Sequence, residues 1–213
     1  MTGLTSPWLQ TASGRAFDLI NPTADMVDFR HDVPDALARI ARFNGHVPGG
    51  PYSVAQHCCI GADAILDETR RPDLAAAFLL HDAHEAYIGD IPTPVARALA
   101  CLARADNPGD FEAAQAVRRS IEHLKMRVDR AIFEAAGLHW PLLGQEDLLI
   151  KSMDLAMLEA ERRQLLGPSP APWGLETEPP RLRRGALTIW PWIRAADEWR
   201  ARLIRLCPAA LAA

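Results

Sequence analysis

The segment LLHDAHEAYIGD at residues 79–90 places a histidine next to an aspartate, directly after a run of apolar residues. On a helical wheel of about 100° per residue, Asp82 falls about 100° from His81, and Glu85 falls about 40° from it. These three side chains share one arc, which also carries apolar side chains. Charged groups on a buried face are costly unless they are paired or bind a metal. Imidazole and carboxylate suit divalent transition metals, so we interpret this segment as part of a metal site.

Two ligands from one helix are too few for a metal ion, so we expect others from elsewhere in the chain. His57 lies beside the apolar stripe of a predicted helix, and Asp154 shares a helix face with apolar residues. Each has an alternative interpretation, because a lone buried histidine is often a hydrogen-bonded core residue and a lone acid is often ion-paired. Glu161 lies on the same face as Asp154, where it either supports the metal site or pairs with an arginine.

The candidate ligands follow one another along the chain in the order His57, His81, Asp82 and Asp154. This order resembles the H…HD…D pattern of the HD superfamily of metal-dependent phosphohydrolases. The resemblance implies an all-α HD-domain helical bundle in which these four side chains bind the metal. The stretch HDAHEAYIGDIPTP is similar to the HDxxE…GDxPTP signature of bacterial HD-domain 5′-deoxynucleotidases, which remove phosphate from deoxynucleoside monophosphates. That similarity implies that Glu85 and Asp90 lie in the active site.

The resemblance extends to an arginine followed by an aromatic residue, Arg42-Phe43, fifteen positions before His57. It implies that Arg42 binds the phosphate, for which a guanidinium offers a fork of donors. The aromatic residue of that family is a tryptophan associated with rejection of ribose. Phe43 stands there in this chain, so the preferred sugar is left open.

We expect one divalent transition-metal ion (Co, Mn, Zn, Fe or Ni) and hydrolysis of a phosphate ester by a metal-activated water. Glu85 would orient the water or move its proton. Asp90 would hold the ribose hydroxyls or assist the leaving oxygen. His84 falls at about −60° on the wheel, outside the shared arc, so we place it with Arg42 and Phe43 among the substrate-binding residues.

Other functions fit the same residues. A (deoxy)nucleoside triphosphohydrolase uses the same four ligands and needs more positive charge, for which the basic RLRR at 181–184 is available. A non-catalytic HD regulatory or ligand-binding module is disfavoured by the presence of Glu85 and Asp90. A helical interaction protein would dock a partner through the tryptophan-rich C-terminal segment, although such tryptophans more often pack onto their own core. A second metal ion would need further histidines, for which His123 and His139 are available.

Helical periodicity and alanine-rich stretches predict an all-α protein, with a short paired segment near residues 17–22 of an otherwise irregular N-terminal region, 1–27. Ser53 and Thr93 are expected as N-caps, and Gly89 as a helix end. Residues 167–185, rich in proline and glycine, are expected to form an exposed loop. The predicted helices span residues 34–42, 53–68, 73–88, 94–103, 109–136, 145–166 and 195–206.

The chain has 213 residues, of which 49% are hydrophobic and 23% charged, as is ordinary for a globular protein. We expect a single HD phosphohydrolase domain over residues 1–213, with a core at about 34–166 and a C-terminal extension at 167–213. The net charge of −4 argues against a nucleic-acid polymer as partner, and no apolar run approaches the roughly 20 residues that span a bilayer. The absence of a signal peptide and of C-x-x-C pairs predicts a cytoplasmic protein with reduced cysteines. The family resemblance implies a homodimer and a small phosphorylated substrate, in the first place a nucleotide.

Overall fold

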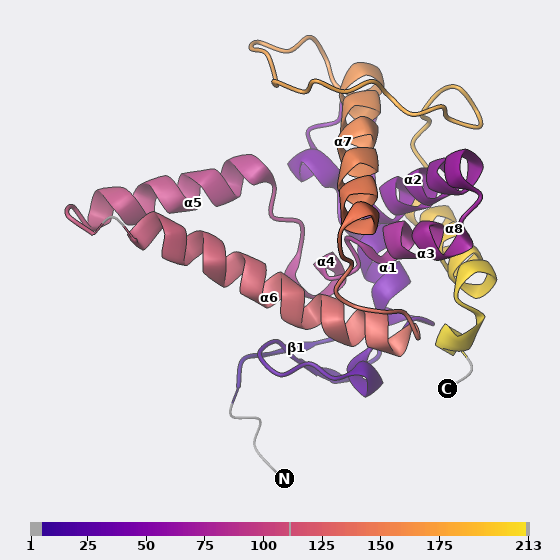
Figure 1. Cartoon of the computed structure of the whole chain (residues 1–213), viewed down its shortest axis with the longest axis horizontal. Helices are drawn as coiled ribbons and strands as arrows, with labels where there is room; N and C mark the ends of the chain where they lie inside the picture. Colours follow the sequence, from indigo (N-terminus) through magenta and orange to yellow (C-terminus); the bar gives the residue numbers. More distant parts are fainter. Residues whose placement is uncertain (1–5, 111, 212–213) are drawn as a thin grey trace.

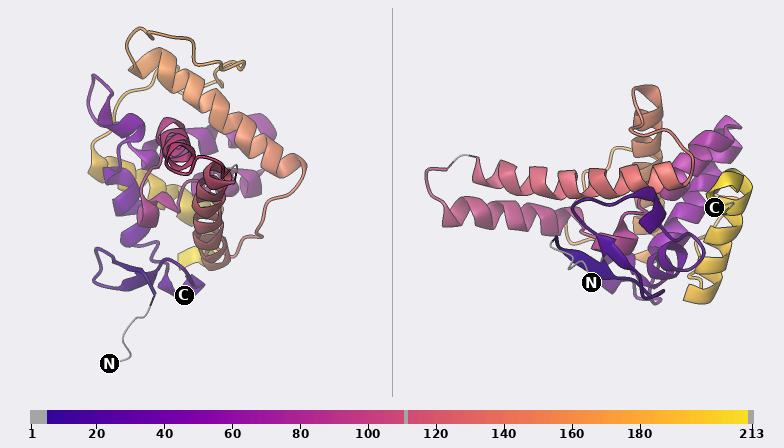
Figure 2. Two further views of the ribbon diagram at one scale, coloured as in Figure 1. Left: turned by 90° about the vertical axis from the view of Figure 1, so that its left-hand side faces the viewer. Right: turned by 90° about the horizontal axis from the view of Figure 1, so that it is seen from below.

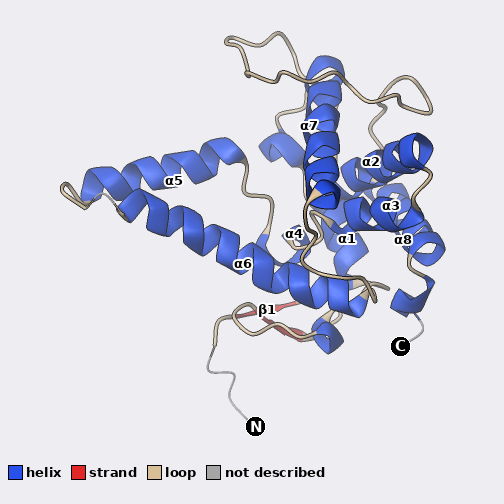
Figure 3. Ribbon diagram, viewed as in Figure 1, coloured by secondary structure: helices blue, strands red, loops and turns tan. Residues whose placement is uncertain are grey.

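Helices dominate the computed structural model, which describes residues 6–110 and 112–211 (Figure 3). The expected all-α class is confirmed. A small hairpin precedes the helices and consists of β1, Trp8–Gln10, and β2, Ala16–Asp18, which pair antiparallel. Residues 1–5, part of the N-terminal region that we expected to be irregular, lie outside the described residues.

The hairpin closes one end of the helical core. Phe17, on its second strand, is fully buried and stacks on Tyr87 with ring centroids 3.6 Å apart. The paired segment expected near residues 17–22 thus lies a few residues earlier in the chain. Strand pairing is decided by the partner strand and by burial, which the local sequence pattern does not show.

The helices of the core lie against one another (Figure 1), and their buried side chains form one hydrophobic cluster. These helices are α1, Asp32–Arg39; α2, Val54–Thr69; α3, Pro72–Leu80; and α8, Trp192–Leu206. Gly61 of α2 lies against Phe78 of α3, where an added Cβ would lie 2.1 Å from a ring carbon. Glycine is therefore required for this close approach of α2 and α3. Trp199 of α8 is fully buried, and its indole nitrogen donates to the carbonyl oxygen of Leu79 at 3.3 Å.

The chain between α1 and α2 differs from the prediction. We expected a helix over residues 34–42, but α1 ends at Arg39 and the following residues are extended. Ala41 pairs with Ser53 in an isolated bridge, and the Arg42 amide donates to the Tyr52 carbonyl at 2.9 Å. A short 3₁₀ helix, η2, then covers Arg42–Gly45. This pairing replaces the last helical turn, and it depends on residues about ten positions later. The Ser53 N-cap is confirmed, because its hydroxyl accepts from the Gln56 amide.

The prediction of one continuous helix over residues 73–88 is wrong in its middle. It is split into α3 and a short α4, Glu85–Ile88, joined by turns at 81–84. In an unbroken α-helix the Phe78 carbonyl would accept from the amide four residues later. It accepts instead from the His81 ring at 2.7 Å and from the His81 amide at 3.4 Å. This side-chain bond competes with the helical one, and successive bonds between residues three apart follow it. The expected end at Gly89, which has a φ of 76°, is confirmed.

A helical hairpin, which we call the arm, projects away from the other helices, as more than one view shows (Figures 1 and 2). It consists of α5, Thr93–Asp106, and α6, Ala113–Ala135, which correspond to the helices expected at 94–103 and 109–136. Burial in the arm is greatest at the inner end of α6, at Val128, Ile132 and Phe133. Helix α5 begins with Pro92 as its N-cap, one residue before the expected cap.

Helix α7, Gln145–Leu165, crosses the core helices and agrees with the expected helix at 145–166. A long segment without regular structure follows, and α8 starts at Trp192, three residues earlier than expected. Two further 3₁₀ helices are η1, Ala24–Met26, and η3, Pro208–Leu211. Within the described residues, every helix falls short of the length and apolar character that crossing a membrane requires.

Candidate metal centre

Four of the predicted side chains meet in one cluster, although they come from three separate segments of the chain. His57 lies on α2, His81 and Asp82 follow the end of α3, and Asp154 lies near the middle of α7. One ligand atom from each lies within 4.8 Å of every other. We call this set of four residues the His/Asp cluster. The predicted proximity of these residues is therefore observed.

The separations within the His/Asp cluster match those of ligands around one ion. His57 Nε2 lies 3.2 Å from Asp154 Oδ1 and 3.8 Å from Asp82 Oδ2. His81 Nε2 lies 3.3 Å from Asp82 Oδ2 and 3.7 Å from Asp154 Oδ1. Ligand atoms at about 2.1 Å from a shared tetrahedral ion lie about 3.4 Å apart. The cluster could hold a divalent metal ion without rearrangement of the helices.

The two histidines are oriented through their other ring nitrogens. His57 Nδ1 donates to Glu161 Oε1 at 2.6 Å, and His81 Nδ1 donates to the Phe78 carbonyl at 2.7 Å. Such contacts fix the tautomer of metal-binding histidines and direct Nε2 toward the ion. Both Nε2 atoms are buried and, among the described residues, neither makes a hydrogen bond of acceptable geometry, although carboxylate oxygens lie 3.2 and 3.3 Å away. A buried polar atom without a partner is costly, and a metal ion would satisfy both.

The charges of the cluster also suit a cation. Burial alone disfavours the charged form of His81, but the charges of Asp82 and Asp154 outweigh it and hold the pKa of His81 well above its ordinary value. Burial likewise opposes the charge of Asp154, yet its contacts with His57 and His81 hold its pKa well below the ordinary value. Negative charge is therefore concentrated here, and a metal ion would replace the protons that the histidines attract.

Arg42 reaches the cluster from η2. Its Nη1 donates to Asp82 Oδ2 at 3.3 Å and its Nε donates to Glu161 Oε2 at 3.1 Å. Glu161 therefore has both of the roles that the sequence left as alternatives, since it supports His57 and pairs with an arginine. The Arg42 side chain is 12% exposed, so it contacts the buried carboxylates and also reaches solvent.

Phe43 is held beside Arg42 in an uncommon backbone conformation. Its φ is 56° and that of Asn44 is 50°, a left-handed region that bulky side chains seldom adopt. Its ring lies edge-on to Trp173 in the segment after α7, with centroids 6.3 Å apart. Strained residues of this kind occur where the surroundings fix them, often at functional sites. The Phe43 ring thus lies next to Arg42, whose guanidinium carbon is 5.8 Å from the ring centroid.

Glu85 and Asp90 are placed differently from each other. Glu85 is 5% exposed, and its Oε2 is buried without a hydrogen-bond partner within the described part of the chain. Burial, together with the charges of Asp82 and Asp90, raises the pKa of Glu85 to about 9. Asp90 is half-buried after the end of α4, and burial raises its pKa as well. Glu85 is thus an inner group and Asp90 lies closer to solvent.

His84 lies deeper than the helical wheel indicated. It is 4% exposed, and its Nδ1 donates to Asp129 Oδ1 of α6 at 2.9 Å. The wheel misplaced it because residues 81–84 form turns with about three residues per turn, so residues three apart lie on the same side. Asp129 was missed by the sequence interpretation. The available signal was an acid next to the buried apolar residues Val128 and Ile132, as at Asp154.

Three other histidines of the chain lie outside the cluster. His46, His123 and His139 are all exposed. His123 and His139 were the histidines considered for a second metal ion, and both are absent from the groups of His, Cys, Asp and Glu that lie close enough together to bind one. That route to a dinuclear site is therefore wrong.

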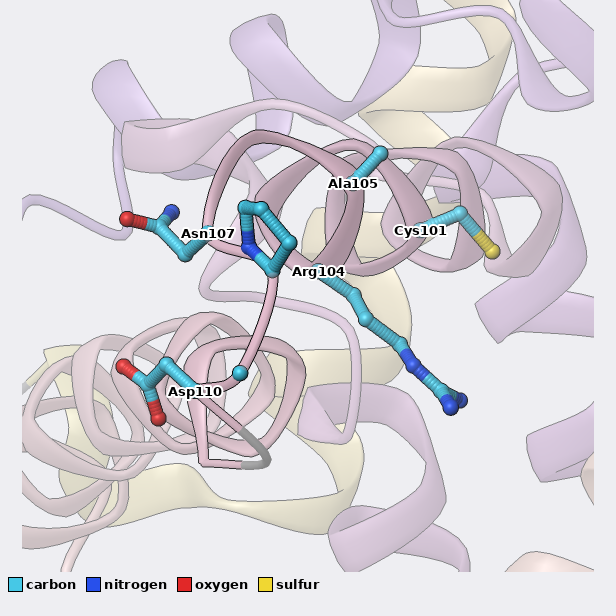
Figure 4. A pocket seen from close by; sticks show the side chains of 7 residues that line it. Cys101, Arg104, Ala105, Asn107 and Asp110 are labelled. Carbon is cyan, nitrogen blue, oxygen red and sulfur yellow. The ribbon is translucent and has the colours of Figure 1, made fainter.

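Two hollows in the surface lie away from the His/Asp cluster. One, of about 430 Å³, lies at the tip of the arm between Cys101, Arg104 and Asp110 (Figure 4). Another, of about 670 Å³, lies between the first half of α7 and residues 177–181. None of the residues that line these hollows belongs to the His/Asp cluster. The centre is identified by its chemistry rather than by the shape of the surface.

The fold and the cluster together define an all-helical protein with a buried His/Asp site that could bind a metal ion. The chain is 32% identical over 160 residues to "Uncharacterized protein YfdR" of Escherichia coli strain K12, covering 74% of this chain and 72% of that protein. The chain therefore belongs to the same family as YfdR. It is also 37% identical over 97 residues to "Uncharacterized protein RCAP_rcc00048" of Rhodobacter capsulatus, which covers 43% of this chain and 48% of that relative. A scan against models of protein families gives no match.

Proposed function

We propose that this protein is a metal-dependent phosphohydrolase of the HD superfamily that releases phosphate from nucleoside or deoxynucleoside monophosphates. The observation that carries the proposal is the His/Asp cluster, with two buried imidazole Nε2 atoms and two carboxylates directed at one point. When bound, a divalent ion would polarise a phosphoryl oxygen and make a water more acidic. His57, His81, Asp82 and Asp154 would hold it.

Glu85 is the group best placed to move a proton. Its Oε2 is buried and has no hydrogen-bond partner in the described structure, and Asp82 is close enough to influence its charge. The pKa of about 9 belongs to a carboxyl that carries a proton near neutral pH. Positive charge at the neighbouring cluster would lower this pKa toward the range in which Glu85 accepts a proton from water. Asp90, nearer to solvent, would hold a sugar hydroxyl or assist the leaving oxygen.

Arg42 would bind the phosphate of the substrate. Two of its nitrogens, Nε and Nη1, are fixed on Glu161 and Asp82, which leaves Nη2 to donate to a phosphoryl oxygen. Phe43 would lie next to the same substrate. Because Arg42 shares Asp82 with the metal ligands, a phosphate held by its guanidinium would lie beside the ion.

Release of a single phosphate is favoured over release of triphosphate. The basic segment at 181–184, which was available to neutralise a triphosphate, has Arg183 paired with Asp67 at 2.6 Å and with Asp63 at 3.2 Å. Both acids lie on α2, so this arginine is bound to the body of the protein through its own ion pairs. Analysis of the products, phosphate against triphosphate, separates the two activities.

The test is a phosphate-release screen over nucleoside and deoxynucleoside mono- and triphosphates, with Co²⁺, Mn²⁺, Zn²⁺, Fe²⁺ and Ni²⁺ added in turn. We expect activity on monophosphates that disappears after chelation and returns with a divalent ion. Asp154→Asn should abolish it, whereas Asp147→Asn, a change on the exposed start of the same helix, should not. Activity that survives exhaustive chelation, or no hydrolysis of any substrate with any ion, would contradict the proposal.

A further inference from the structure

A second group of potential ligands lies next to the His/Asp cluster. Ligand atoms of Asp82, His84 and Glu85 lie within 4.8 Å of one another, so these three residues form a second group that could hold an ion. Asp82 belongs to both groups. Its Oδ2 is the atom that approaches both histidines of the first group, which leaves Oδ1 for another ion.

Two atoms of this second group are buried without hydrogen-bond partners in the described structure. They are His84 Nε2 and Glu85 Oε2, and their residues are 4% and 5% exposed. A neutral imidazole nitrogen and a carboxylate oxygen in such surroundings lose their bonds to water and gain none from the protein. This is the same sign that distinguishes Nε2 of His57 and of His81.

His84 is also oriented as a metal ligand is. Its Nδ1 donates to Asp129 Oδ1 at 2.9 Å, and Asp129 is itself 6% exposed. This carboxylate has the same relation to His84 that Glu161 has to His57. A buried carboxylate on Nδ1 fixes the ring and leaves Nε2 as the nitrogen available to a metal ion.

The balance of charge favours a second cation. Six buried or half-buried carboxyl groups lie in and beside the two sites, on residues Asp82, Glu85, Asp90, Asp129, Asp154 and Glu161. Arg42 is the basic side chain that contacts two of them. Arg42 and one divalent ion together supply three positive charges, so a second cation would still meet an excess of carboxyl groups.

We propose that His84, Glu85 and Asp82 form a second metal site, with Asp82 shared between two divalent ions and Asp129 positioning His84. The proposal extends the metal-dependent function given above. Glu85 would hold the second ion through Oε2 and keep Oε1 for its proton. Two neighbouring ions would bind two oxygens of one phosphate ester, which favours in-line displacement at phosphorus.

The test counts bound metal in the full chain. After removal of metal by a chelator, the protein is saturated with Mn²⁺, separated from free ion and analysed by elemental mass spectrometry. We expect two ions per chain, together with the electron paramagnetic resonance signal of a coupled manganese pair. His84→Asn keeps a donor to Asp129 but removes the Nε2 ligand, so it should bind one ion and give the signal of isolated manganese. His123→Asn, at an exposed histidine of α6, should still bind two.

One ion per chain in the unaltered protein would overturn the proposal, as would two ions retained by His84→Asn. Circular dichroism shows whether the variant folds. If His84→Asn does not fold, the number of ions bound by the unaltered protein and by the Asp129→Asn variant tests the proposal. Asp129→Asn should weaken metal binding at the second site roughly 10–100-fold and leave metal binding at the first site unchanged. Metal binding is measured without substrate, so the two proposals can fail separately. A protein that binds two ions but hydrolyses no substrate would contradict the proposed function alone. A protein that hydrolyses substrate with one bound ion would contradict the second metal site alone.

Discussion

Each histidine of the centre uses its two ring nitrogens for different purposes. Nδ1 of His57 and of His81 bonds to the protein, and Nε2 is left buried without a partner in the described structure. A core histidine with a structural role would have both nitrogens satisfied. This division is the residue-level evidence that the cluster could bind a metal ion.

Glu161 should contribute to metal affinity although it does not contact the ion. We expect Glu161→Gln to weaken binding of Mn²⁺ roughly 10–100-fold, because the amide orients His57 less firmly and no longer increases its basicity. Titration calorimetry on the chelated protein measures this. Glu159→Gln is the matched control, since Glu159 lies on the same helix and pairs with Arg162 and Arg163. Equal affinity in the two variants would contradict the role of Glu161.

Glu85 should affect turnover more than it affects the first metal ion. We expect Glu85→Gln to lower kcat roughly 10²–10⁴-fold, because the amide cannot accept a proton. The ion held by the His/Asp cluster should remain, which metal analysis checks. Glu68→Gln, at an exposed acid of α2, should leave kcat unchanged. A fully active Glu85→Gln enzyme would exclude Glu85 from proton transfer.

At the level of elements, the break between α3 and α4 is the decisive feature. The Phe78 carbonyl accepts from the His81 ring, so the helix ends and residues 81–84 form turns. These turns direct His81 toward α2 and α7, and His84 toward α6. An unbroken α-helix would have placed His84 about 60° to one side of His81.

The contact of α2 with α3 should support both stability and metal binding. A methyl group at Gly61 would lie 2.1 Å from the Phe78 ring, whose own carbonyl orients His81. We expect Gly61→Ala to lower the free energy of unfolding by about 1–3 kcal/mol, measured by urea denaturation, and to weaken metal binding. Gly167→Ala is the control, because no atom lies within 4 Å of the added carbon. Unchanged stability in Gly61→Ala would show that α2 can shift freely.

At the level of the whole molecule, α8 returns to cover α1, α2 and α3. Trp199 is fully buried and Trp190 is 8% exposed, so these tryptophans pack onto the core of their own chain. Trp192 is 43% exposed and lies under the guanidinium of Arg39, at 4.1 Å. Docking of a partner through Trp190 and Trp199 is therefore excluded in this conformation.

The packing of the whole chain should also decide which thiols react. Cys101 is exposed on the arm, whereas Cys58, Cys59 and Cys207 are buried. Burial raises the pKa of Cys58 and of Cys207 to about 11 and raises the pKa of Cys59 further, so their thiolates are scarce at pH 8.

When the native protein is titrated with a thiol reagent at pH 8, we expect one thiol to react rapidly. In denaturant, we expect all four thiols to react. Cys101→Ser should remove the fast thiol. More than one fast thiol in the native protein would contradict the burial of the other three.

The sequence alone determined the all-helical class, the approximate extent of most helices and the identity of the four clustered residues that could bind a metal ion. Periodicity and capping are local properties, and His or Asp on an apolar face is visible without a structure. Tertiary structure decided the rest. The pairing of residue 41 with residue 53 positions Arg42, the His81 bond to Phe78 breaks the helix, and the approach of α6 gives His84 its partner Asp129. These contacts join residues whose proximity depends on the packing of several helices at once, which no local pattern encodes.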